Sequence, residues 1–96
     1  MDIKQDIEQQ AAARAALLAS LPHDVQAALN QLPDAGRGFV LDRVRDLKDP
    51  CQASDRKRNS GVYMGAVGYA YMMGQVDNTQ FNRLFEFELT LTAAPA

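Results

Sequence analysis

Prolines and glycines divide this chain into short segments, and in most of these segments apolar residues recur at helical spacing. The first segment has an apolar residue about every four positions, which predicts a helix from about Asp2 to Ala19 whose apolar face consists of Ile3, Ile7, Ala11, Ala15 and Leu18. Helices that alternate with short turns predict an all-α protein.

Prolines mark the ends of the next two predicted helices. Ser20 has the side chain of an N-cap and precedes Pro22 in a first helical turn, so we expect a helix over residues 22–31 that buries Val25, Ala28, Leu29 and Leu32. Pro33 ends that helix, and Asp34 is expected to cap a third segment that ends at Pro50 and contains Phe39, Val40, Val44 and Leu47. Residues 51–59 are polar apart from the cysteine and predict the main loop, unless Ser54 caps an early start of the next helix.

The segment 61–75 is apolar on almost all sides, which predicts a fourth helix that is buried on most of its surface. Asp77 and Gln80 then form a variant of the capping box, an N-cap with a glutamine three residues later. A fifth helix is expected to follow, with one side formed by Phe81, Leu84, Phe85 and Leu89.

Residues 85–92 allow two interpretations. They alternate apolar and polar side chains, which is typical of a half-buried strand, whereas the spacing of Phe81, Phe85 and Leu89 and the cap at Asp77 favour a helix through about Glu88. We favour the helix, because no second segment alternates well enough to pair with a strand. The predicted fold is a compact all-α bundle of four to five short helices in one domain over residues 1–96, with a C-terminal strand at 85–92 as the minor alternative.

The chain is small and has few residues that carry chemistry. A domain of 96 residues buries a limited core, and small domains commonly add disulfides, a metal or self-association. With one cysteine, Cys51, and one histidine, His23, the chain cannot form an internal disulfide or supply four zinc ligands, so we expect a homodimer without metal or cofactor. An enzyme built around Cys51 or His23 is a weak alternative, because neither has a second group in the sequence to complete a catalytic set.

The net charge of −2 averages over three unlike regions. Residues 1–36 carry −3, residues 37–58 carry +3 and residues 59–96 carry −2. The basic region suggests an alternative function as a nucleic-acid-associated regulator, although a pI near 5.2 is low for such a protein. The start of the chain lacks the charge and apolar pattern of a secretory signal, and the apolar segment is shorter than a membrane span needs, so we expect a cytoplasmic protein.

The segment 61–74 contains three tyrosines and three methionines in addition to its small residues. It is either the central core helix or a surface that meets another chain, since tyrosine and methionine are enriched at protein interfaces. On the second interpretation the contact residues are Tyr63, Tyr69, Tyr71, Met72 and Met73, with Arg56, Lys57 and Arg58 as charged contacts. The sequence therefore favours a small non-enzymatic regulator, adaptor or inhibitor that docks on a larger bacterial protein assembly, of the kind that phages and plasmids encode.

Overall fold

The computed structural model describes residues 3–92, which form five α-helices and one 3-10 helix. Along the chain these are α1 (Ile3–Ala19), α2 (His23–Asn30), α3 (Asp34–Lys48), η1 (Pro50–Asp55), α4 (Arg56–Met72) and α5 (Asn78–Thr92). No strand occurs in this range, so the prediction of an all-α bundle of four to five short helices is confirmed.

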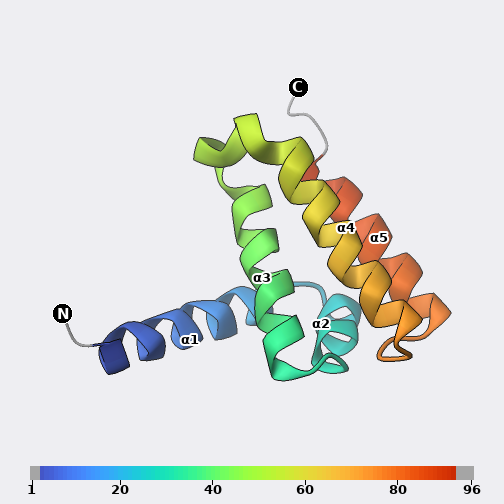
Figure 1. The fold of residues 1–96 in the computed structure, drawn as a ribbon, viewed down its shortest axis with the longest axis horizontal. Helices are drawn as coiled ribbons and strands as arrows, with labels where there is room; N and C mark the ends of the chain where they lie inside the picture. Colours follow the sequence, from blue (N-terminus) through green and yellow to red (C-terminus); the bar gives the residue numbers. More distant parts are fainter. Residues whose placement is uncertain (1–2, 93–96) are drawn as a thin grey trace.

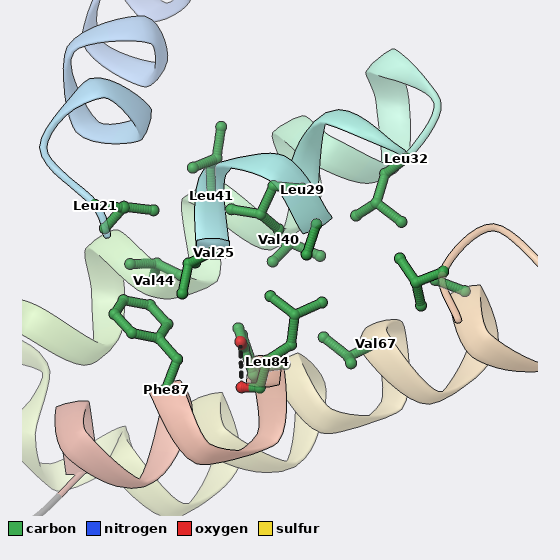
Figure 2. Packing of buried hydrophobic residues seen from close by; sticks show 14 of the residues in the cluster. Leu21, Val25, Leu29, Leu32, Val40, Leu41, Val44, Val67, Leu84 and Phe87 are labelled. Atoms are coloured by element: carbon green, nitrogen blue, oxygen red, sulfur yellow. Dashed lines mark hydrogen bonds between the residues drawn. The ribbon is translucent and has the colours of Figure 1, made fainter. Parts of the chain in front are cut away.

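The helices α2 to α5 enclose the core, and α1 contacts this bundle through its C-terminal half, mainly at α3 (Figure 1). The two long helices α4 and α5 pack side by side, α3 packs on α4, and the short α2 packs on α5 near one end of the bundle. In Figure 2, Leu84 and Phe87 of α5 point toward Val25 of α2 and Val44 of α3. The core residues expected on α2 are all buried, as are Leu32, Val40, Val44 and Leu47.

Helix α1 differs most from its expected packing. It has no buried residue, and only Leu17 and Leu18, near its C-terminal end, pack against the core cluster. Arg14 adds a bidentate ion pair with Asp42 of α3, in which its Nε and Nη2 donate to the two carboxylate oxygens over 2.9 and 2.7 Å. The N-terminal half extends away from the bundle (Figure 1). The apolar side chains of Ile3 and Ile7 remain exposed.

The capping box before α5 is confirmed, and two other predicted caps are wrong. The amide of Gln80 donates to Asp77 Oδ1 over 2.7 Å, and the amide of Asp77 donates to Gln80 Oε1 over 3.0 Å. Ser20 does not cap α2, because its hydroxyl instead donates to the carbonyl of Leu17 at the end of α1. Asp34 is the first residue of α3 rather than its cap, and it pairs with Arg37 one turn later.

The predicted loop over residues 51–59 is wrong in the structure. The 3-10 helix η1 occupies its first half, where the amide of Cys51 donates to the side chain of Asp49. The alternative of an early start of the next helix is correct, because α4 begins at Arg56, but Asp55 rather than Ser54 precedes it. Residues 51–59 are polar because most of their side chains contact solvent at this corner of the molecule. Solvent exposure favours polar residues in a helix as well as in a loop, so composition did not distinguish the two.

The strand alternative for residues 85–92 is also wrong, because α5 continues to Thr92. The helix buries Leu84 and Phe87, and it leaves Phe85 and Leu89 exposed. The alternation of apolar and polar residues in 85–92 therefore does not mark a buried and a solvated face. Residues three apart lie on the same side of a helix, so Leu84 and Phe87 both face the core between α2 and α4.

Candidate protein-binding surface

Four large side chains surround the C-terminal end of α4 and remain in contact with solvent. Their exposed fractions are 61% for Tyr69, 41% for Tyr71, 85% for Met72 and 58% for Met73. We call these four residues the Tyr–Met surface. The prediction that 61–75 is buried on most sides is therefore wrong, because the core takes up one stripe of α4, consisting of Asn59, Tyr63, Val67 and Ala70.

The end of α4 is fixed by a Schellman motif, in which two amides beyond the helix bond back to its last turn. Gln75 donates to the carbonyl of Ala70 over 2.9 Å, and Gly74 donates to that of Tyr71 over 3.0 Å. Gly74 has φ of 73°, a conformation that favours glycine. The chain therefore turns sharply after Met73, and the Tyr–Met surface lies at a well-defined corner.

Tyr71 is held in place by α5. Its ring stacks on that of Phe81 with the centroids 4.8 Å apart, and its hydroxyl donates to Asn78 Oδ1 over 3.4 Å. A tyrosine fixed in this way loses little conformational entropy when a partner binds. Met72 is the most exposed of the four side chains, and its flexible thioether adapts to irregular surfaces.

An apolar groove of about 260 Å³ lies between α3 and α4 and includes Tyr69 of the Tyr–Met surface in its lining. Its rim includes Tyr69 and Phe39, a residue of α3 that is 46% exposed. The other lining residues are Leu32, Pro33, Gly36, Val40, Ala66, Ala70 and Gln75. Phe39 was not among the contact residues expected from the sequence; in the structure the guanidinium of Arg43, one turn later, lies 5.3 Å from its ring centroid.

Tyr63 does not join the other predicted contact residues at the surface. It is fully buried in the core, where its hydroxyl donates to the carbonyl of Leu84 over 2.8 Å. Burial in the core raises its pKa well above the usual value, and the nearby carboxylate of Glu88 adds to this effect. Tyr63 therefore serves the packing of α4 on α5 and presents no surface to another chain.

The basic residues Arg56, Lys57 and Arg58 form the first turn of α4, so they lie at the opposite end of this helix from the Tyr–Met surface. Fourteen residues separate Lys57 from Tyr71, which corresponds to about 21 Å along a helix. Lys57 and Arg58 are exposed, while Arg56 is half-buried and its Nε has no hydrogen-bond partner among the described residues. The structure thus separates the charged and apolar parts of the predicted interface.

Most of the other basic residues in 37–58 are neutralised by aspartates of the same helix. Arg37 pairs with Asp34 over 2.5 Å, Arg43 with Asp46 over 3.1 Å, and Arg45 lies within 3.7 Å of Asp42 and 3.3 Å of Asp46. The positive charge that remains available to a partner comes from Lys48 and from the first turn of α4.

A buried polar contact between α4 and α5 was missed by sequence reasoning. Glu88 is 4% exposed, and Ser60 Oγ donates a hydrogen bond to its Oε1. Asn59 is also buried, and its Nδ2 has no hydrogen-bond partner in the described part of the chain. Glu88 is one of the polar residues in the alternating segment 85–92, and as part of a strand it would face solvent. Its contact with α4 follows only from the orientation of α5 about its own axis in the structure.

The two residues considered for enzymatic chemistry both lie at the surface. Cys51 is an exposed free cysteine in η1, and His23 is the exposed first residue of α2. Over residues 3–92, no three histidine, cysteine, aspartate or glutamate side chains gather closely enough to hold a metal ion. In the same range no helix has the length and apolar character to cross a bilayer.

Comparison of the chain with protein-family models, with curated proteins and with solved structures gave no match.

Proposed function

We propose that this protein is a non-enzymatic binding protein that docks on a larger bacterial protein assembly, as a regulator, adaptor or inhibitor of the kind that phages and plasmids encode. The observation that carries the proposal is the Tyr–Met surface at the end of α4, together with the groove beside it. Exposed large apolar side chains grouped in this way are typical of protein-binding sites.

The composition of this surface suits a small number of strong contacts. Tyrosine is enriched among the residues that contribute most to binding, and such residues act best when they fill pockets in the partner and are shielded from water. Tyr71 supplies a fixed aromatic ring beside α5, and Met72 and Met73 supply flexible contacts at the same end of α4. The groove between Phe39 and Tyr69 offers a complementary hollow in which the partner can place an apolar side chain of its own.

The first turn of α4 plays a separate role in this proposal. Exposed cations at the rim of an interface contribute more to the rate of association than to its final strength. We propose that Lys57 and Arg58 steer an acidic partner toward the bundle, since about 21 Å separates them from the apolar contact. On this basis, Lys57→Gln with Arg58→Gln lowers the association rate and its dependence on salt, and leaves the dissociation rate nearly unchanged.

The test is to capture the partner from the native host with the wild-type protein as bait and to compare two variants. In Met72→Glu with Met73→Glu, two charges replace the most flexible part of the Tyr–Met surface, so captured partner should fall at least tenfold. Both side chains are more than half exposed, and the free energy of unfolding should change by less than about 0.5 kcal/mol. Mass spectrometry quantifies the captured proteins, and calorimetry with the purified partner measures the affinity.

The matched control is Leu89→Glu, which replaces a half-exposed apolar residue of α5 by the same charged residue. This control should capture as much partner as the wild type. Equal capture by the methionine variant and the wild type would show that the Tyr–Met surface is not the binding site. If capture and stability fell together, Met72 and Met73 would contribute to folding rather than to binding.

A further inference from the structure

Helix α1 is attached to the bundle near its C-terminal end. None of its residues is buried, and the two that pack against the core, Leu17 and Leu18, belong to its last turn. Leu21, just beyond the helix, is 6% exposed and anchors the chain in the core. The side chain of Gln26 donates to the carbonyl of Leu21 over 2.7 Å, which ties this junction to α2. The attachment of α1 therefore has a fixed point immediately after its last turn.

One ion pair holds α1 at a greater distance from this fixed point. Arg14 Nε and Nη2 donate to the two carboxylate oxygens of Asp42 in α3 over 2.9 and 2.7 Å. Arg14 lies five residues before Ala19, the end of the helix, which corresponds to about 7.5 Å along its axis. A bidentate pair of planar groups restricts direction as well as distance. The pair therefore sets the angle at which α1 leaves α3.

Cavities flank this ion pair on both sides of α1. A cavity of about 380 Å³ lies against Ala13 and Arg45, and another of about 350 Å³ lies against Ala15 and Gly38. Ala13 and Ala15 are on opposite sides of Arg14 around the helix. Close packing fixes the position of a helix in a protein interior, but on neither side of Arg14 do α1 and α3 fill the space between them. The contact leaves room for α1 to tilt in either direction.

Helix α1 is suited to move as one rigid piece. Six of its 17 residues are alanine, which has the highest helix propensity, and it contains no glycine or proline. Its length exceeds the limit of about 12–15 residues below which an isolated helix is marginal. Sixteen residues separate Ile3 from Ala19, about 24 Å of helix, so a tilt of about 20° moves the start of α1 by roughly 8 Å.

We propose that α1 is a hinged arm that pivots about Ser20 and Leu21, and that the Arg14–Asp42 ion pair is a latch that holds the arm in the orientation seen in Figure 1. When the latch opens, α1 stays helical and samples angles toward both cavities. Opening breaks a single ion pair whose side chains are 39% and 21% exposed, so water and salt compete with it. Arg45 also lies 3.7 Å from Asp42, but it belongs to α3 and does not hold the arm. The proposal is independent of the Tyr–Met surface.

Distances between two spin labels test the hinge in the whole protein. Glu8→Cys places one label on α1, and the native Cys51, exposed in η1, carries the other. Pulsed electron paramagnetic resonance should give a narrow distribution of distances with the latch intact. Arg14→Gln or Asp42→Asn should at least double the width of this distribution, while circular dichroism shows unchanged helix content. The matched control pairs Cys51 with Asn82→Cys, an exposed position of α5, and its distribution should not change in either variant.

Reversal of the charges separates the latch from a general loss of structure. Arg14→Asp alone should broaden the distribution, and Arg14→Asp with Asp42→Arg should narrow it again. A width that Arg14→Gln and Asp42→Asn leave unchanged would overturn the proposal, because packing would then fix the angle. A broad distribution in the protein with the latch intact would also overturn it. So would a broadening accompanied by loss of helix content, because α1 would then unfold instead of pivoting.

Discussion

At the scale of single residues, Gly74 is the position where the backbone most restricts the side chain. Its φ of 73° lies in the left-handed region, which costs other residues about 1–2 kcal/mol. Gly74→Ala should therefore lower the free energy of unfolding by about 1 kcal/mol. Gly65→Ala is the control: it lies inside α4, an added Cβ meets no atom within 4 Å, and the substitution should stabilise by about 0.5–1 kcal/mol. Urea denaturation measures both changes, and a stabilising Gly74→Ala would contradict the role of the Schellman motif.

Tyr63 gives a second prediction at this scale, which concerns alkaline pH. Because burial raises its pKa in the folded state above the ordinary value near 10, the folded protein holds its proton more tightly than the unfolded chain does. Stability should therefore fall as pH rises above about 10. Tyr63→Phe lacks this titration; it should cost about 1 kcal/mol at pH 8 through the lost hydrogen bond to Leu84, and this deficit should shrink between pH 10 and 11. A deficit that stays constant across these pH values would show that Tyr63 does not resist ionisation.

At the scale of elements, the sequence predicted most helices because their buried residues recur with helical spacing. The expected core positions of α2 are buried without exception, and the capping box before α5 forms as expected. The errors occur where one spacing of apolar residues fits more than one buried face. Phe85 and Leu89 satisfy a helical spacing, but the packing of α5 against α2 and α4 buries Leu84 and Phe87 instead.

The candidate surface was predictable in part for the same reason. The number of tyrosines and methionines in α4 exceeded the needs of one buried stripe, and four of the five predicted apolar contact residues are exposed. Which tyrosine would be buried depended on where α3 and α5 pack, and the sequence contains no signal for this. The groove and Phe39 depend on the distance between α3 and α4, a tertiary property that helical spacing alone does not determine.

The ion pair between Arg14 and Asp42 leads to a prediction about the attachment of α1 to α3. The hydrogen bonds from Arg14 hold the pKa of Asp42 below its usual value, so the folded state favours the charged carboxylate. This contribution is present above the ordinary pKa, near 4, and is lost as pH falls through the lowered value. At pH 7, Arg14→Gln and Asp42→Asn should each destabilise by up to about 1 kcal/mol, because both partners are partly exposed.

A double-mutant cycle over Arg14→Gln and Asp42→Asn checks this prediction. The coupling free energy between the two residues should be measurable at pH 7 and should decrease as pH falls through the lowered pKa of Asp42, because the carboxylate then takes up a proton. Coupling that does not change with acid pH would show that the two side chains interact by packing rather than by charge.

At the scale of the whole molecule, the distribution of buried residues divides the chain into a packed part and an attached helix. The core cluster comes from the stretch between Leu21 and Phe87, and α1 adds only partly buried residues at its end. Opening of a segment costs free energy in proportion to the apolar contacts that it breaks, so the parts of this molecule should differ in local stability. The N-terminal half of α1 should open far more often than α4 or α5.

Hydrogen exchange followed by mass spectrometry or NMR measures this difference. The amides of residues 7–11 should exchange at least a hundredfold faster than those of Val44, Val67 and Leu84, which are fully buried in the core. Uniform protection of all helices would contradict the division of the molecule into a packed part and an attached helix, because α1 would then open no more often than α4 and α5.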